Sequence, residues 1–216
     1  MNIFLDPVIA DAYDSYYQTE TGKKVNKVEM DLMREALLPV FKGKMLELGC
    51  GTGHWTKLFI QNGFEVLATD ISEAMLKHAK AKKLDAKIIK ADATALPFPE
   101  EYFDVVASVT MMEFVKSKDE VLDEINRVLK PGGWLLLGCL NLNSELAKNT
   151  ANDPVFSNAE FLTSGEWQKK LERFGKVDIF PGIHFSSDFR LTDNTIEQIN
   201  FEPAFLLARV QKTNNK

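Results

Sequence analysis

The chain has 216 residues, of which 45% are hydrophobic and 26% are charged, and its net charge is −5 at pH 7. This length and usage are typical of one globular domain rather than a disordered chain. The acidic balance argues against a broad nucleic-acid-binding surface, and the two cysteines exclude a disulfide scaffold and favour a reducing compartment. No apolar run is long enough to predict a membrane span, and the first residues lack the regions of a secretory signal. We therefore expect a single domain over residues 1–216, located in the cytoplasm.

The first forty residues predict helices. Residues 6–20 are rich in Tyr and Asp and are typical of a short amphipathic helix. Residues 24–38 carry apolar side chains at the spacing of one helix face, and Pro39 ends this helix.

Strands and helices then alternate. Short apolar runs predict five strands, at 45–48, 64–69, 86–91, 103–109 and 134–140. Amphipathic stretches predict helices between them, at 54–62, 72–83 and 117–129. Ser72 is expected to cap one of these helices, and Ser117–Glu120 is expected to form a capping box at another. This alternation predicts a doubly wound α/β fold with a mostly parallel sheet and helices on both faces.

The pattern loosens towards the carboxyl terminus. Residues 141–160 are typical of a loop, and Thr163 with Glu166 predicts a second capping box that opens a helix. Two further strands are predicted, at 177–180 and 204–210. The connection between them, 181–202, is long for a compact domain, and such connections are usually functional or mobile.

The most informative segment is Met45–Trp55, MLELGCGTGHW, which indicates a strand, a glycine-rich turn and the start of a helix. Its glycines let the backbone turn sharply and approach a ligand closely, and the helix start offers unpaired N–H groups. Asp70 ends the next strand, where a carboxylate can accept hydrogen bonds from both hydroxyls of a ribose. The alternative role for Asp70 is to cap the following helix, although Ser72 can already do so.

Two kinds of nucleotide cofactor compete for this arrangement. The dinucleotide fingerprint is G-x-G-x-x-G, and His54 stands where its last glycine should be. The spacing here is G-x-G-x-G, preceded by Glu47. A carboxylate beside the turn would repel a pyrophosphate but suits a cationic ligand that carries an amino acid. A nicotinamide-dependent oxidoreductase is therefore the minor alternative.

Several successive segments resemble the class I S-adenosylmethionine-dependent methyltransferases, of the small type 11 kind. Glu47–Gly53 is similar to the first motif of that family, and Asp70 matches its ribose-binding acid. Ala91–Phe98 is similar to the adenine-side loop, in which Asp92 would bind the adenine amino group. Two more segments resemble the start of the fourth strand and the approach to the fifth, Phe103–Val106 and Glu124–Gly133. Together these segments cover about residues 45–140.

The resemblance implies a Rossmann-like sheet of seven strands, with the last strand antiparallel and inserted beside the fifth. It implies S-adenosylmethionine as cofactor and S-adenosylhomocysteine as product. It divides the chain into an N-terminal helical lid, a cofactor-binding core, and a region of substrate-side loops with a strand pair, at 1–40, 41–140 and 141–216. The cofactor-binding residues that it implies are Tyr13, Tyr16, Glu47, Gly49, Cys50, Gly51, Gly53, Trp55, Asp70, Ile71, Met75, Asp92, Ala93 and Ser108.

The tyrosine-rich segment Tyr13–Tyr17, followed by Gly22, resembles the lid of one subset of the family. The alternative is that these tyrosines only attach the first helix to the sheet. With the N-terminal segment, three loops are expected to form the walls of an acceptor pocket, 111–116, 141–158 and 181–202. All should overhang the carboxyl ends of the parallel strands, where ligands bind in open α/β sheets.

Methyl transfer in this family is an in-line displacement, so the protein supplies position and electrostatics, and a general base is needed only if the acceptor keeps its proton. Glu113 follows the fourth strand and is the first candidate for a base or for orienting a cationic acceptor. The alternative for Glu113 is a surface or cap residue. His184 is the second candidate, and its alternative is a place on a loop surface.

The missing signatures narrow the acceptor. The D/N-P-P-F/Y signature of many amino-group methyltransferases is absent, since Ser108–Met111 stands in its place, and Glu113 has no partner for a double-glutamate loop. No acid cluster resembles a magnesium site, so no metal is expected. A small-molecule acceptor is favoured, with no nucleic-acid partner. The alternative class is a non-catalytic protein that binds S-adenosylmethionine or S-adenosylhomocysteine and acts through a partner, which would need no open path for an acceptor.

Overall fold

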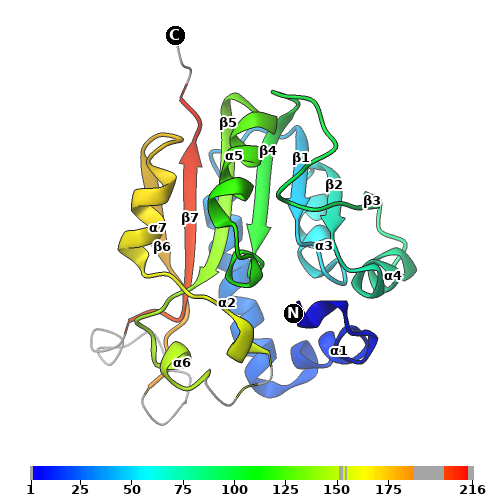
Figure 1. Ribbon diagram of the computed structural model, residues 1–216, viewed down its shortest axis with the longest axis vertical. Coiled ribbons are helices and arrows are strands. Elements are labelled where there is room, and N and C mark those ends of the chain that lie inside the picture. Colours follow the sequence, from blue (N-terminus) through cyan, green and yellow to red (C-terminus); the bar gives the residue numbers. More distant parts are fainter. Residues whose placement is uncertain (1, 151–152, 154, 187–201, 214–216) are drawn as a thin grey trace.

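The computed structural model describes residues 2–150, 153, 155–186 and 202–213. Seven strands form one sheet, namely β1 (Lys44–Leu48), β2 (Glu65–Asp70), β3 (Lys87–Lys90), β4 (Phe103–Val109), β5 (Leu129–Leu140), β6 (Val177–Pro181) and β7 (Phe205–Gln211). Their order is β3-β2-β1-β4-β5-β7-β6 (Figure 1). Strands β1 to β5 pair in parallel, whereas β7 is antiparallel to both β5 and β6. The expected seven-stranded sheet with an inserted antiparallel strand is thus confirmed.

Helices cover both faces of the sheet. The helices are α1 (Pro7–Tyr13), α2 (Glu20–Leu37), α3 (His54–Gln61), α4 (Glu73–Ala81), α5 (Lys118–Val128), α6 (Glu145–Lys148) and α7 (Ser164–Leu171). Short 3-10 turns join them, η1 (Ile3–Leu5), η2 (Tyr16–Gln18), η3 (Met112–Phe114) and η5 (Phe156–Asn158). Helices α2, α3 and α4 pack on one face, and α5 and α7 pack on the other. None of the helices in the described residues is long and apolar enough to cross a membrane.

Strand β4 shows why both faces are covered. Its residues alternate between the two apolar clusters, with Val105 and Ala107 on the α2 face and Val106 on the α5 face. All three are completely buried, and full burial of a Val-sized side chain contributes about 1.5–3 kcal/mol. The continuous apolar run in the sequence therefore becomes a central strand, and its carboxyl end is held in a fixed place.

The element bounds differ from expectation mainly at the ends of the chain. The single helix expected at 6–20 is two pieces, α1 and η2, and α2 begins at Glu20 because the Thr19 side chain accepts a hydrogen bond from the N–H of Gly22. The loop expected at 141–160 contains the short elements α6 and η5. Most of the expected loop 181–202 lies outside the described residues.

Two expectations about caps have different outcomes. The capping box of Thr163 and Glu166 is present at α7 and is confirmed. The capping box expected at Ser117 is wrong, because the Ser117 side chain makes no cap hydrogen bond at α5. Strand β5 also begins at Leu129 rather than at Trp134, with a register shift against β4.

Candidate active site

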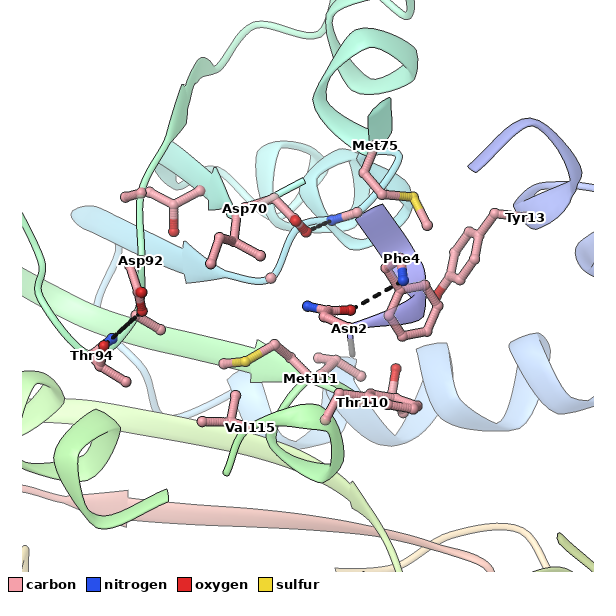
Figure 2. A pocket seen from close by; sticks show the side chains of 18 residues that line it. Asn2, Phe4, Tyr13, Asp70, Met75, Asp92, Thr94, Thr110, Met111 and Val115 are labelled. Atoms are coloured by element: carbon pink, nitrogen blue, oxygen red, sulfur yellow. Dashed lines mark hydrogen bonds between the residues drawn. The ribbon is translucent and has the colours of Figure 1, made fainter. Parts of the chain in front are cut away.

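A cavity of about 200 Å³ lies where the carboxyl ends of β1, β2 and β4 meet (Figure 2). Figure 1 shows α1 and the N-terminus beyond the arrowhead of β4, on this side of the sheet. The residues that line it are Asn2, Phe4, Tyr13, Gly49, Gly51, Thr69, Asp70, Ile71, Met75, Ala91, Asp92, Ala93, Thr94, Val109, Thr110, Met111, Phe114 and Val115. The glycine turn, both candidate acids and the tyrosine segment therefore share one cavity.

The glycine turn brings bare backbone to this cavity. Gly49 and Gly51 have φ angles of 69° and 52°, in the left-handed region that disfavours side chains. A Cβ at Gly49 would collide with the Met111 side chain, whereas a Cβ at Gly51 would meet no atom within 4 Å. Gly51 therefore leaves space against the main chain that a ligand can fill.

Asp70 ends β2 with its carboxylate fixed by two main-chain donors. Its Oδ2 accepts a hydrogen bond from the N–H of Gly51 at 2.8 Å, and its Oδ1 accepts one from the N–H of Ser72 at 2.8 Å. Burial raises the pKa of Asp70, and these hydrogen bonds oppose the rise. The helix cap itself is Ser72, whose Oγ accepts from the N–H of Met75, so Asp70 remains available to the cavity.

Asp92 lies after β3 and lines the cavity, across from Phe4 and Tyr13 in the view of Figure 2. Its Oδ1 accepts hydrogen bonds from the N–H and the Oγ1 of Thr94, at 2.9 and 2.8 Å. This Asx turn fixes the orientation of the carboxylate. The two acids are thus held at separate points of one cavity, as two anchors of an elongated ligand would be.

Thr110, directly after β4, has a φ angle of 48°. A β-branched residue in this region is an outlier that costs about 1–3 kcal/mol, and such strain concentrates at functional sites. The N–H of Thr110 donates to the carbonyl of Gly138 at 2.8 Å, which holds the strained turn on β5. This turn positions Met111 against Gly49.

Eight of the cofactor-binding residues that the sequence predicts line the cavity, and six do not. Those that line it are Tyr13, Gly49, Gly51, Asp70, Ile71, Met75, Asp92 and Ala93, and those that do not are Tyr16, Glu47, Cys50, Gly53, Trp55 and Ser108. Glu47 lies buried behind the turn, where the Oγ1 of Thr56 donates to it at 2.5 Å and burial raises its pKa to about 8. Ser108 points to the α5 face of the sheet, because side chains alternate along β4.

Asn2 and Phe4 of the N-terminal segment line one side of the cavity, although the sequence analysis singled out only the tyrosines of this segment. Figure 2 shows Asn2 between Asp70 and Met111. The Phe4 carbonyl accepts a hydrogen bond from the Ser72 Oγ at 2.6 Å, and the Phe4 ring packs edge-on against Phe114 with centroids 4.7 Å apart. Because these residues precede the first predicted helix, no periodicity could have identified them.

A second set of contacts attaches the tyrosine segment to the glycine turn. The Thr52 Oγ1 donates to the Asp14 carboxylate at 2.6 Å, and Lys82 pairs with the same carboxylate at 2.7 Å. Tyr17 stacks on His54 with ring centroids 3.7 Å apart. Burial lowers the pKa of His54 to about 4, so this ring is neutral at pH 7.

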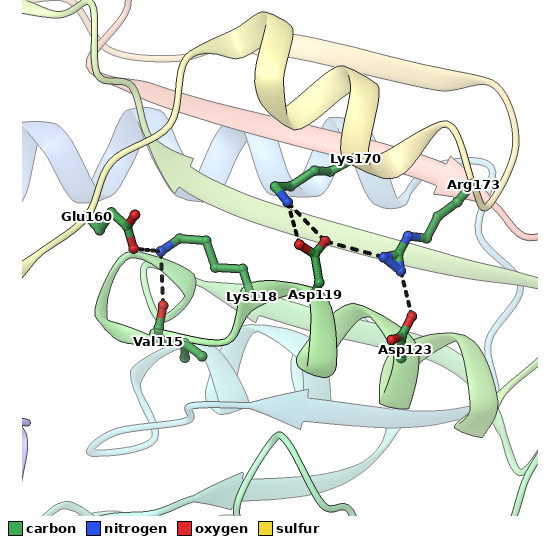
Figure 3. A network of polar contacts seen from close by, with 7 residues as sticks. All are labelled: Val115, Lys118, Asp119, Asp123, Glu160, Lys170 and Arg173. Atoms are coloured by element: carbon green, nitrogen blue, oxygen red, sulfur yellow. Dashed lines mark hydrogen bonds and ion pairs between the residues drawn. The ribbon is translucent and has the colours of Figure 1, made fainter.

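Glu113 is buried, so a surface role for it is wrong. Its side chain is 1% exposed, its Oε1 accepts from the N–H of Leu140, and its Oε2 has no hydrogen-bond partner among the described residues. Burial raises its pKa to about 7. The Glu113 carbonyl accepts from the N–H of Glu160, and Lys118 joins Glu160 to the Val115 carbonyl at 2.9 Å on each side (Figure 3). His184, the second candidate, does not line the cavity.

Glu29 is a buried carboxyl that the sequence analysis missed. It lies on α2, it is 9% exposed, and burial together with repulsion from Glu113 raises its pKa to about 8. A signal was present, because Glu29 stands four residues from both Val25 and Met33, on the apolar stripe of the helix. Among the described residues, no group of acids, histidines and cysteines could hold a metal ion.

Comparison with known proteins agrees with this geometry. Residues 46–137 match the family of methyltransferase domains. The chain is 30% identical over 183 residues to the uncharacterised protein MJ1123 of Methanocaldococcus jannaschii, with 83% of each chain covered. It is 39% identical over 102 residues to the ubiquinone/menaquinone biosynthesis C-methyltransferase UbiE of Burkholderia mallei, but this match covers only 44% of this chain and 42% of that protein.

A solved structure shows the same fold over nearly the whole chain. It is an S-adenosylmethionine-dependent methyltransferase of Thermotoga maritima, described as a possible histamine N-methyltransferase. The TM-score is 0.78 with 23% identity, and the match covers 97% of this chain and 99% of that one. Three observations lead to the same family, namely the strand order, the glycine turn followed by an acid on β2, and the similarity to these relatives. The chain belongs to the class I S-adenosylmethionine-dependent methyltransferases.

Proposed function

We propose that the cavity at the carboxyl edge of the sheet binds S-adenosylmethionine and that the chain methylates a small-molecule acceptor by in-line displacement. The observation that carries the proposal is the Asp70 carboxylate, held by the N–H groups of Gly51 and Ser72 beside open main chain at Gly51. A carboxylate in this position can accept hydrogen bonds from two neighbouring hydroxyl groups of a ribose.

The rest of the cavity suits the two ends of such a cofactor. Asp92 and Ala93 would contact the adenine, and Ile71 and Met75 would cover its faces with apolar surface. The glycine turn, with the Glu47 carboxyl behind it, would hold the cationic amino-acid end. S-adenosylmethionine supplies a methyl group activated by its sulfonium.

The protein groups near the reacting end are mainly apolar. Met111, Phe114 and Phe4 line that side of the cavity, so they can exclude water from the reaction. We assign residues 1–40 as the lid of this site, because η1 and Tyr13 line the cavity and Asp14 is joined to the glycine turn. Such an enclosed site favours an acceptor small enough to fit under the lid.

The cavity volume sets one condition on binding. Pockets for drug-sized ligands usually enclose about 300–1,000 Å³, whereas this cavity encloses about 200 Å³ with Asn2 and Phe4 projecting into it. We infer that η1 shifts outward when the cofactor binds and then packs on it. Such a shift would break the hydrogen bond from the Ser72 Oγ to the Phe4 carbonyl, which joins η1 to the start of α4.

The test is calorimetric binding of S-adenosylmethionine and S-adenosylhomocysteine. Asp70→Asn keeps the size of the side chain but removes its charge, and we expect the affinity to fall by about 1.5–3 kcal/mol. The matched control is Asp85→Asn, which makes the same change at an exposed position away from the cavity. Binding of neither ligand by the wild type would refute the cofactor proposal, and equal affinity in Asp70→Asn would refute the role of Asp70.

The acceptor class has its own test. The protein is incubated with methyl-labelled S-adenosylmethionine and separate cell fractions that contain small molecules, proteins or nucleic acids. We expect label in the small-molecule fraction. Label found only in a macromolecular fraction would contradict the proposed acceptor class while leaving the methyltransferase assignment intact.

A further inference from the structure

The loop that follows β3 is held by two charged side chains of α5, Glu124 and Arg127. We propose that this pair positions the loop so that it recognises the adenine ring of the cofactor, and that both are positioning residues for base specificity. The inference rests on the proposed function, because it concerns the adenine end of the same cavity. It goes further by assigning a role to two residues that do not line the cavity.

The loop spans residues 91–98, and its first half forms part of the cavity wall. Residues 91–94 all line the cavity (Figure 2). The start of the loop is tied to the sheet, because the N–H of Ala91 donates to the Asp70 carbonyl at 3.1 Å. A loop held only at its start can still swing, so the contacts of its second half decide whether the wall residues keep one position.

Arg127 binds two main-chain carbonyl groups in this second half. Its Nη1 donates to the Phe98 carbonyl at 2.7 Å, and its Nη2 donates to the Leu96 carbonyl at 3.0 Å. A guanidinium group is planar and carries its donors in a fixed fork. Two contacts from one fork therefore fix the direction of the loop as well as its place.

Glu124 binds the same part of the loop through the opposite kind of atom. Its Oε2 accepts hydrogen bonds from the N–H of Leu96 at 2.6 Å and from the Nη2 of Arg127 at 2.7 Å, and its Oε1 accepts one from the Arg127 Nε at 2.6 Å. The hydrogen bonds from Arg127 lower the pKa of Glu124, so the carboxyl is ionised at neutral pH. The pair thus binds both the N–H and the carbonyl of Leu96.

Apolar packing also holds the loop, but it is not directional. The Leu96 side chain is buried in the apolar cluster on the α5 face, and the Phe98 ring packs edge-on against Phe103 with centroids 5.1 Å apart. Such contacts keep the loop against the helix without setting its exact path. The contacts of Glu124 and Arg127 with the loop go to main-chain atoms, so the pair sets the path of the backbone.

The path of the loop matters because of what Asp92 has to distinguish. Thr94 orients the Asp92 carboxylate, which can accept a hydrogen bond from the amino group of adenine. Hypoxanthine carries an oxygen in place of this amino group, and its lone pairs would face the carboxylate. Discrimination between the two bases therefore requires Asp92 at hydrogen-bond distance from the base, and the place of the loop sets that distance.

The test measures base selectivity together with affinity. The probes are S-adenosylhomocysteine and S-inosylhomocysteine, which differ only in the base, and calorimetry gives the dissociation constant of each. We expect the wild type to bind the adenine compound more tightly by about tenfold or more, the usual effect of a hydrogen bond to a charged group.

The variants are Arg127→Gln and Glu124→Gln. In both we expect the affinity for S-adenosylhomocysteine to fall by about tenfold, the cost of ordering one further backbone residue on binding. We also expect the ratio of the two dissociation constants to fall towards one. A pair that only stabilised the fold would lower the urea concentration at which the protein unfolds but would leave this ratio unchanged.

The matched control is Arg173→Gln. Arg173 pairs with Asp123 on the same helix at 2.6 Å, but it joins α5 to the segment after α7 (Figure 3). Its loss should change neither the affinity nor the ratio. Arg127→Lys is a second, milder variant that keeps the charge. One ammonium group cannot reproduce the fork, so we expect its ratio to lie between those of Arg127→Gln and the wild type.

A double variant tests whether the pair acts through Asp92. Asp92→Asn should by itself remove most of the preference for adenine. Adding Arg127→Gln to Asp92→Asn should then change the ratio no further, because both substitutions affect the same contact with the base. A further change of the ratio in the double variant would contradict this route.

The outcomes separate the two proposals. Failure of the wild type to bind S-adenosylhomocysteine would overturn the proposed function itself. Binding of S-adenosylhomocysteine with the same ratio in the wild type, Arg127→Gln and Glu124→Gln would overturn the positioning role alone, whatever the stability of the variants. Equal affinity of the wild type for the two ligands would also overturn it, because no base specificity would remain to be set.

Discussion

Three glutamates, Glu29, Glu47 and Glu113, are buried behind the carboxyl edge of the sheet, each with a raised pKa. The sequence singled out two of them for a reason that the structure explains. Glu47 precedes the glycine turn and Glu113 follows the fourth strand, so each is identified by a neighbouring element. Glu29 lies beside no such motif, and its only signal in the sequence is its place on the apolar stripe of α2, four residues from Val25 and from Met33.

Removing one of these carboxyls should change how stability depends on pH. A buried Glu with a pKa near 8 in the folded chain and near 4.5 in the unfolded chain binds more protons when folded. Stability is therefore greatest below about pH 4.5 for this group and falls as pH rises towards 8. We expect Glu29→Gln to be more stable than the wild type at pH 8, by about 4 kcal/mol, and to differ from it by less than about 1 kcal/mol at pH 5.

Urea unfolding of both proteins at a series of pH values measures this difference. Glu113→Gln should show the same pH dependence of stability over a narrower pH range, because the pKa of Glu113 in the folded chain is about 7. Glu35→Gln, exposed on the same helix, should run parallel to the wild type at every pH. A constant offset between Glu29→Gln and the wild type from pH 5 to 8 would mean that Glu29 is ionised throughout.

At the scale of elements, helix starts show what a sequence pattern can and cannot predict. Thr163 and Ser117 both precede a helix and have an acid three residues later, so the sequence predicts two capping boxes. Thr163 has an extended backbone, with ψ at 161°, and its Oγ1 accepts from the N–H of Glu166. Ser117 has ψ at 65°, and its hydroxyl makes no cap hydrogen bond. The residue types at positions 117 and 120 do not contain this backbone angle, so the local pattern cannot separate the two helix starts.

Thr163→Ala should therefore cost about 1 kcal/mol of stability, the usual loss for a cap. Ser117→Ala should lower the stability by only about 0.3 kcal/mol, because no cap hydrogen bond is lost. Denaturant unfolding of the two variants gives both values in one experiment. Equal losses would contradict the distinction between the two helix starts.

The N-terminal segment depends on a glycine within α2. A Cβ at Gly22 would collide with the carbonyl of Tyr16, so α2 and η2 can approach each other only because residue 22 has no side chain. In an ordinary exposed helix, Gly→Ala adds about 1 kcal/mol of stability. Gly22→Ala should instead push the tyrosine segment away from α2 and lower both stability and affinity for S-adenosylhomocysteine.

Gly165→Ala is the matched control, since a Cβ at Gly165 in α7 meets no atom within 4 Å. It should leave the affinity for S-adenosylhomocysteine unchanged. Calorimetry on the two variants decides the question. Unchanged affinity in Gly22→Ala would show that the position of the tyrosine segment does not matter for the cofactor.

At the scale of the molecule, the sequence predicts the centre of the chain better than its ends. From β1 to β4 each strand is a short apolar run, each connection is short, and a parallel sheet follows almost directly. The candidate site residues of this region, Gly49, Gly51, Asp70 and Asp92, line one cavity. The contributions of Asn2 and Phe4 arise from contacts across the fold, such as that with Ser72, and these have no local pattern.

This arrangement places one cavity between segments that are far apart in the chain. Residues 2–13, the glycine turn, the ends of β2 and β3 and the turn after β4 all contribute to its walls. A ligand bound there should restrain all of them together, whereas β6 and β7 lie at the other side of the sheet, separated from β4 by β5. Binding should also stabilise the whole fold by mass action, by about 2.7 kcal/mol when the free ligand concentration is 100 times the dissociation constant.

Hydrogen exchange with and without S-adenosylhomocysteine tests this directly. We expect slower exchange in the segments that form the cavity walls, at 2–20, 49–53, 70–76, 91–95 and 109–115, as measured under conditions where only local opening contributes. The amides of β6 and β7 should exchange at the same rate in both states and serve as the internal control. Protection at the glycine turn and β2 without protection at 2–20 would show that the N-terminal segment does not close over the cofactor. Protection of all segments alike would show that only global stability had changed.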